Sequence, residues 1–220
     1  MNRSSPPTFV AVLMLIAVSP SGAAVAGPQA QEAEPSVAPA PQLAIVVEVE
    51  NEARMSPADL AAMEEVVSRT YRAIGVGVIW VYGYGGVSPQ DPRRLRAHLR
   101  LLSRTTADRK IVTDRIDPGV LGRANRPARI VYIFCHRVGE ASRKYGHEYT
   151  RVLGFVAAHE LGHVLLPAYS HSETGIMKGS ANLRARTVHE FTPEEGEAIR
   201  AGLLGERRRR AEALRLPQPH

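Results

Sequence analysis

The sequence of 220 residues contains one cysteine, Cys135. A single thiol cannot form an internal disulfide, and because Cys135 lies in an apolar run we expect it to pack in the core and not to act as a nucleophile. Aromatic residues are also scarce, at 5% of the chain, and none lies among the arginines near the C-terminal end. This argues against a nucleic-acid interface built on base stacking, so no nucleic-acid partner is expected.

Long hydrophobic runs are lacking as well. The apolar stretch at residues 9–18 is shorter than the roughly 20 residues that cross a bilayer. Arg3 precedes it and the small residues 24–26 follow it, a pattern that predicts a secretory signal peptide over residues 1–26, cleaved after Ala26. We therefore expect a secreted or periplasmic protein, with an uncleaved membrane anchor as the alternative.

The rest of the chain divides by composition. Residues 27–42 are rich in alanine and proline and predict a disordered linker. Residues 43–205 are long enough for one domain with a sizeable core, and residues 206–220 are expected to form a basic tail. The formal net charge is +6, and much of the excess lies in Arg207–Arg210. Such a run is most often a solvated helix end; the functional alternative is contact with an anionic surface such as membrane lipid, cell-wall polymer or nucleic acid.

Apolar periodicity predicts a mixed sheet with helices, an α+β fold. Strands are expected at residues 43–50, 76–82, 95–101 and 130–135, and the second of these is apolar on both faces, which is typical of a central strand. Helices are expected after Ser56, over residues 148–165 and after Thr192; the first and last begin with a capping residue followed by proline. The strand–helix–strand order at the start predicts a parallel crossover.

The segment His159-Glu160-Leu161-Gly162-His163 is the most informative part of the sequence. Helical residues four apart lie on the same face with Cβ atoms about 5–6 Å apart, so both imidazoles can reach one zinc ion. Glu160 lies one step around the helix, where it can take a proton from water at the metal. Apolar residues on every side predict a buried helix, in which unsatisfied histidines would be costly. Gly162 costs a helix about 1 kcal/mol relative to alanine, which indicates a close approach of another group.

A third protein ligand is needed, because catalytic zinc usually has three and keeps one position open for water. Pro167 cannot continue the helix and restricts the residue before it, so the helix is expected to end near Leu165. His171 is the first imidazole that the returning chain can deliver to the metal. Glu173 and Glu190 are the alternative third ligands, because carboxylates also bind zinc.

The histidine motif, followed by His171-Ser172 and Gly175-Ile176-Met177, resembles the zinc site of metzincin metallopeptidases, the matrixins in particular. The resemblance implies a zincin-like α+β fold, with a mixed sheet packed on an active-site helix and a C-terminal helix. It implies that His159, His163 and His171 are the zinc ligands. It also implies that Glu160 is the general base and that Met177 is the methionine of a turn beneath the metal. The third histidine comes two residues later than in the family pattern, and Leu166 stands where a glycine is usual. Met177 as an ordinary core residue is the equal alternative.

The expected function is that of a secreted zinc metallopeptidase, an endopeptidase rather than an exopeptidase, with Zn²⁺ as cofactor and a peptide or protein as substrate. Water activated by zinc would attack the peptide bond with Glu160 as general base. The alternative is a non-catalytic, zinc-stabilised extracytoplasmic binding protein, in which Glu173, His189 or Glu190 closes the coordination sphere.

Two further features concern the substrate. Tyr169 and His136 are candidates for holding the oxyanion, and the sequence selects neither. Residues 111–127 predict an irregular segment before a buried strand. It is either a sheet edge along which an extended peptide pairs or an ordinary surface loop.

Overall fold

The computed structural model describes residues 43–83, 94–166, 171–179 and 190–215. The predicted signal peptide (1–26) and linker (27–42) lie outside these residues. The chain divides into two units, Met1–Ala38 and Pro39–His220, and the description concerns the second. No helix of the described residues is long and apolar enough to cross a membrane.

A five-stranded sheet forms the centre of this unit, in the order β2-β1-β3-β5-β4. The strands are β1 Ala44–Asn51, β2 Gly77–Tyr82, β3 Leu95–Leu101, β4 Gly122–Asn125 and β5 Ile130–Ile133. Four strands are parallel to their neighbours, and β4 pairs with β5 in the antiparallel sense. The mixed α+β architecture is therefore the one that the sequence predicts.

The first crossover links β1 to β2 through α1, Pro57–Ala73. The Ser56 hydroxyl accepts the Asp59 amide at the start of α1, as the capping pattern predicts. The prediction that residues 76–82 form a central strand is wrong, because β2 lies at an edge of the described sheet. Its apolar residues are only half-buried; one face packs on α1, where the Trp80 indole donates to the Ser68 hydroxyl at 3.0 Å.

Two helices were not predicted, α2 Arg104–Asp114 and α3 Cys135–Tyr145. Both are rich in polar residues; α2 buries only Ala107, and α3 buries only Cys135, Val138 and Ser142, so few apolar residues mark either helix in the sequence. Helix α2 occupies the first part of residues 111–127, the segment expected to be irregular. Cys135 begins α3 and does not end β5, but it is buried, and burial raises its pKa to about 12. An inert packing role, as predicted, agrees with this environment.

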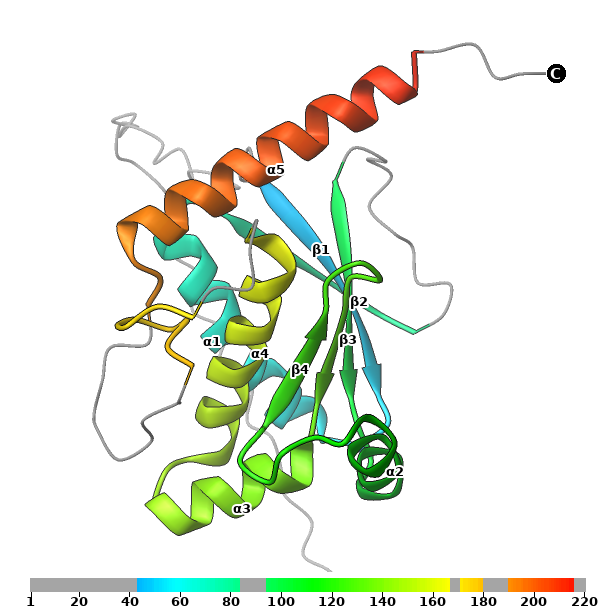
Figure 1. Cartoon of the computed structure of the whole chain (residues 1–220), viewed down its shortest axis with the longest axis vertical. Helices are drawn as coiled ribbons and strands as arrows, with labels where there is room; N and C mark the ends of the chain where they lie inside the picture. Colours follow the sequence, from blue (N-terminus) through cyan, green and yellow to red (C-terminus); the bar gives the residue numbers. More distant parts are fainter. Residues whose placement is uncertain (1–42, 84–93, 167–170, 180–189, 216–220) are drawn as a thin grey trace, which may run out of the picture. The chain divides into compact units, whose positions relative to one another are not determined.

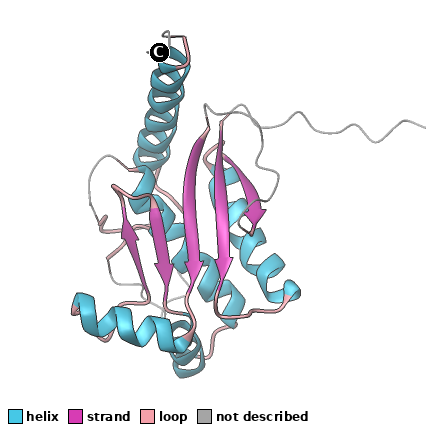
Figure 2. Cartoon of the chain, turned by 90° about the vertical axis from the view of Figure 1, so that its right-hand side faces the viewer, coloured by secondary structure: helices cyan, strands magenta, loops and turns pink. Residues whose placement is uncertain are grey.

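Helices α1 and α4 (Tyr149–Leu165) cover one face of the sheet, which Figures 1 and 2 show from the side and from the front. Apolar residues of alternating strand positions point into this layer and form the core, among them Ile45, Val47, Leu99 and Val131. The opposite positions of β1 and β3 carry charges that pair across the strands, as in Arg96–Glu48 at 2.7 Å. The sheet thus has one apolar, buried face and one face that is mainly polar, although Ala44 and Val46 on it are also buried.

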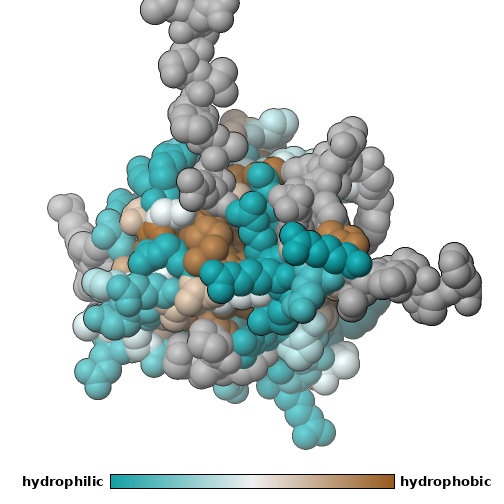
Figure 3. Space-filling view, turned by 90° about the horizontal axis from the view of Figure 1, so that it is seen from above, coloured by the Kyte–Doolittle hydropathy of each residue, from teal (hydrophilic) through white to brown (hydrophobic). Residues whose placement is uncertain are grey.

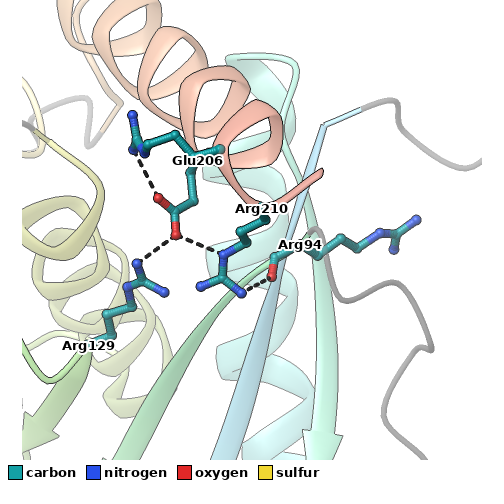
Figure 4. A network of polar contacts seen from close by, with 5 residues as sticks. Arg94, Arg129, Glu206 and Arg210 are labelled. Carbon is teal, nitrogen blue, oxygen red and sulfur yellow. Dashed lines mark hydrogen bonds and ion pairs between the residues drawn. The ribbon is translucent and has the colours of Figure 1, made fainter. Parts of the chain in front are cut away.

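Helix α5, Pro193–Ala213, begins with a capping box between Thr192 and Glu195 and buries Ile199 and Leu203. Its later turns are fixed by Glu206, which pairs at 2.8 Å with both Arg129 and Arg210 (Figure 4). Hydrogen bonds from these arginines, Arg210 foremost, lower the pKa of Glu206 to about 2. The tail expected from residue 206 is therefore helical as far as Ala213, because Glu206 holds this part of α5 on the domain.

Candidate metal and active site

The site is built on α4, a helix that is buried on nearly every side. Glu148 caps its first turn by accepting the amides of Thr150 and Arg151. Gly154 lets α4 approach α1 closely, since a Cβ there would lie 2.5 Å from the Cβ of Val66. The helix ends at Leu165 and Leu166 is extended, as the proline at position 167 predicts. This packing fixes the face on which the two motif histidines lie.

The structure brings His159, His163 and His171 together. The Nε2 atom of His163 lies 3.1 Å from Nε2 of His159 and 3.2 Å from Nε2 of His171. One ring nitrogen from each residue lies within 4.8 Å of the others. Nitrogens at two corners of a tetrahedral zinc site, with bonds of 2.0–2.1 Å, are about 3.3–3.4 Å apart. The observed spacing therefore suits a single tetrahedral ion.

The hydrogen bonds of this cluster also favour a cation. Nδ1 of His159 lies 2.7 Å from the carbonyl oxygen of Ile176, which can only accept, so Nδ1 carries the proton and Nε2 presents a lone pair. Burial lowers the pKa of His159, and burial with the two neighbouring imidazoles lowers the pKa of His163 to about 4. Neutral rings are the form that binds metal. Nε2 of His163 carries at most one proton, so it cannot donate a full hydrogen bond to both Nε2 of His159 and Nε2 of His171. A metal ion, in contrast, accepts the Nε2 lone pairs of all three histidines.

His171 is delivered by a compact segment of residues 171–179. The amide of Ser172 donates to the carbonyl of Met177 at 3.1 Å, and the amide of Ile176 donates to the carbonyl of Glu190 at 2.8 Å. Gly175 has φ +74, and a Cβ there would lie 2.8 Å from the same Glu190 carbonyl oxygen, so only glycine fits without strain. These backbone hydrogen bonds help to hold the third imidazole in position.

Met177 is fully buried and packs beneath the helical motif. A Cβ on Gly162 would lie 2.5 Å from the Met177 sulphur and 3.2 Å from Cε1 of Phe191. The Phe191 ring in turn contacts Tyr71 edge to face, with centroids 5.1 Å apart, and the Tyr71 hydroxyl donates to the Ala158 carbonyl at 3.0 Å. The close approach predicted at Gly162 is thus made by a methionine side chain, and a buried aromatic pair supports the helix from the same side.

Glu160 is buried, with 8% of its surface exposed, and lies against strand β4. A Cβ on Gly122 would lie 2.8 Å from Cγ of Glu160 and 3.1 Å from its Oε1. Burial raises the pKa of Glu160 to about 8, against the opposing effects of the Ala124 backbone amide and the Arg123 guanidinium. The contact between β4 and this carboxylate was not predicted from the sequence, where the small residues Gly122 and Ala124 are its local signal.

The other candidate residues that the structure describes are not part of the histidine cluster, although Glu173 and His136 line the cleft beside it. Within the described ranges, the potential metal cluster comprises the three histidines and includes neither Glu173 nor Glu190. His136 lies 3.4 Å from the Asp108 carboxylate, and burial lowers its pKa. Tyr169 and His189 fall outside the described residues. A fourth protein ligand that would close the site is therefore not found among the residues that the structure describes.

A cleft of about 1550 Å³ opens beside the histidines. Its walls come from β4, from helices α2, α3 and α4, and from residues 171–179, and they include Arg123, Phe155 and Tyr145. Strand β4 forms the sheet edge along this cleft, since it pairs only with β5 in the described sheet. Residues 122–125 of the segment 111–127 therefore form a sheet edge, which was one of the two alternatives for this segment.

No family model and no curated protein sequence matches the chain. Similar solved structures include a zinc-dependent peptidase from Methanocorpusculum labreanum, 14% identical, with a TM-score of 0.45 over 72% of this chain and 99% of that one. Archaemetzincin from Methanopyrus kandleri is 16% identical, with a TM-score of 0.44 over 76% and 99%. Metalloproteinase-II from Bacteroides fragilis is 12% identical, with a TM-score of 0.42 over 73% and 52%. The functional conclusion rests on the geometry of the site.

Proposed function

We propose that the protein is a zinc-dependent metallopeptidase that hydrolyses peptide bonds. The observation that carries the proposal is the convergence of three Nε2 atoms at 3.1 and 3.2 Å beside a buried carboxylate on the same helix. His159, His163 and His171 hold the metal. A purely structural zinc site has no use for a buried acid next to its ligands, and usually takes a fourth protein ligand.

The roles of the residues follow from their positions. Bound zinc supplies a Lewis acid that polarises the scissile carbonyl and lowers the pKa of water. Glu160 takes a proton from the attacking water as the C–O bond forms and passes it to the leaving nitrogen as the C–N bond breaks. Gly122 and Ala124 keep that carboxylate in place, by close contact and by the backbone amide. Ile176 orients His159 through its carbonyl oxygen.

The substrate is a peptide in extended conformation, cleaved internally. Strand β4 offers an edge with backbone groups to which a peptide can add as a further strand. The cleft of about 1550 Å³ exceeds the roughly 300–1,000 Å³ of small-molecule pockets, which suits a chain that continues past the metal on both sides. On the strength of the predicted signal peptide, we also propose that this activity lies outside the cytoplasm; mass spectrometry of the purified N-terminus would show whether the chain begins at Gly27.

The test compares metal content and peptide cleavage in matched variants. Glu160→Gln is expected to keep about one zinc per chain and to lose cleavage by about 10²–10⁴-fold. His163→Ala is expected to lose both, whereas His98→Ala, an exposed histidine on β3, should change neither. A peptide-library digest with and without chelator would identify the cleaved bonds. Cleavage by Glu160→Gln at the parental rate would contradict the assignment of the base, and metal-free active protein would contradict the whole proposal.

A further inference from the structure

The last turns of α5 carry a concentration of positive charge that the proposed peptidase site does not use. We define residues 204–215 as the basic end of α5. It contains five arginines against two glutamates, a net charge of +3. The helix projects beyond the sheet here (Figures 1 and 2), and its last buried residue is Leu203. A helix that gains nothing more from the core nevertheless continues for about three turns.

The way this segment is fixed leaves its outer face open to solvent. Glu206 and Arg210 point toward the domain, where Arg210 also donates to the backbone carbonyl of Arg94 at 3.3 Å (Figure 4). Arg207, Arg208 and Arg209 are exposed, and Arg209 shows 71% of its side chain to solvent although it pairs with Glu206. The inner ion pairs thus hold the helix while its other arginines face outward.

Apolar residues are interleaved with these charges. Leu204 is 43% exposed and Leu214 is 58% exposed, two of the four large hydrophobic residues that are exposed in the described chain. Residues spaced by three and four positions lie on one helix face; here that face comprises Leu204, Arg207, Arg208, Ala211, Leu214 and Arg215. Seen from above, the side on which α5 lies in Figure 1, hydrophilic residues predominate and apolar residues show between them in several small areas (Figure 3).

We propose that the basic end of α5 binds the surface of an anionic lipid bilayer. Arginines beside leucines on one helical face match an interface in which the guanidinium groups reach lipid phosphates while the apolar side chains enter the headgroup region. Nucleic acid fits less well, because no aromatic side chain lies among the arginines to stack on bases. The binding would hold the peptidase cleft close to membrane-associated substrates.

Vesicle sedimentation at about 0.1 M salt tests the proposal with the whole protein, its N-terminus determined by mass spectrometry. Binding is measured to vesicles that contain phosphatidylglycerol and phosphatidylcholine and to vesicles of phosphatidylcholine alone. The readout is the ratio of the first binding constant to the second, because any contribution from the N-terminal apolar stretch cancels in this ratio. Each arginine near an anionic surface contributes about fivefold to binding. Arg207→Gln, Arg208→Gln and Arg215→Gln, which change the three exposed arginines of this face, together should therefore lower the ratio on the order of 100-fold.

The matched control replaces three exposed arginines of α1 and α2, Arg69, Arg72 and Arg109, by glutamine. It removes the same charge and should leave the ratio nearly unchanged. Should the triple variant misfold, as judged by circular dichroism, the single change Arg208→Glu serves instead, with an expected fall of roughly 25-fold. Leu204→Ser with Leu214→Ser should weaken binding several-fold without changing its salt dependence.

Three results would overturn the proposal. The first is equal binding of the parental protein to anionic and neutral vesicles. The second is an equal loss in the control variant, which would mean that net charge and not this helix face decides binding. The third is tighter binding to a short DNA duplex than to anionic vesicles at equal phosphate concentration, which would make nucleic acid the partner.

Discussion

Replacing Gly162 by alanine tests the packing beneath the three histidines. A new Cβ would lie 2.5 Å from the Met177 sulphur and 3.2 Å from Phe191 Cε1. Met177 is fully buried, so its side chain has no free space into which it can move. The methionine and the chain of residues 171–179 would have to shift, and His171 belongs to that segment.

The magnitude follows from two opposing effects. Alanine in a helix interior is about 1 kcal/mol more favourable than glycine. Overpacking a dense core costs about 1–3 kcal/mol. The free energy of unfolding should therefore fall by about 0–2 kcal/mol. Gly205→Ala in α5, where the new Cβ would meet only the flexible end of Arg209 at 3.4 Å, should instead stabilise by about 0.5–1 kcal/mol.

Urea unfolding of both variants, together with zinc affinity measured by competition with a chromophoric chelator, provides the assay. Gly162→Ala is expected to weaken zinc binding, and Met177→Ala in the same chain should restore part of the loss because it makes room for the new methyl group. If Gly162→Ala stabilised as much as Gly205→Ala and bound zinc with parental affinity, the contact between the methionine and the metal helix would have no role in placing His171.

Three other changes probe separate parts of the structure. Gly122→Ala places a Cβ 2.8 Å from Cγ of Glu160; it should lower kcat/KM by about 10–100-fold without changing zinc content, and unchanged kinetics would refute the contact. Tyr71→Phe removes the hydroxyl that donates to the Ala158 carbonyl and should lower the free energy of unfolding, measured by urea titration, by about 1 kcal/mol. An unchanged free energy of unfolding would show that this hydrogen bond does not stabilise the fold. Glu206 has its pKa lowered to about 2, chiefly by the hydrogen bond from the arginine four residues later, so its stabilisation is complete above about pH 4.5 and is lost as the pH falls toward 2. Between pH 7 and 3 the unfolding temperature should fall more steeply for the parental protein than for Glu206→Gln. The stability that the parental protein loses through this group is at most about 3 kcal/mol. Parallel curves for the two proteins would contradict the pairing.

The local signals in the sequence were reliable where short-range physics decides the structure. Ser56 and Thr192 cap their helices as predicted, because a cap needs only an amide two or three residues away. The motif histidines lie on one helix face because four residues make about one turn. Proline at position 167 ended α4 at Leu165 because it cannot donate a hydrogen bond.

Long-range packing explains the failures. Residues 76–82 are apolar on both faces, yet they form an edge strand, since strand order depends on which neighbours pair and not on composition. Helices α2 and α3 were not predicted because both bury few residues; the period of α2 is weak, and that of α3 comes mainly from its charged residues. The run Arg207–Arg210 is helical, as its most frequent interpretation predicts, but the sequence did not predict that Glu206 pairs there with Arg129, which lies far away in the chain.

The sequence alone determined that two imidazoles and a carboxylate share one helix, and that the chain turns back soon after it. Only the tertiary structure decided that His171 and not Glu173 joins them, that β4 packs on Glu160, and that Met177 lies under Gly162. The physical reason is one of range: hydrogen bonds and helical period act over a few residues, whereas these contacts arise when elements far apart in the chain pack together at van der Waals distance.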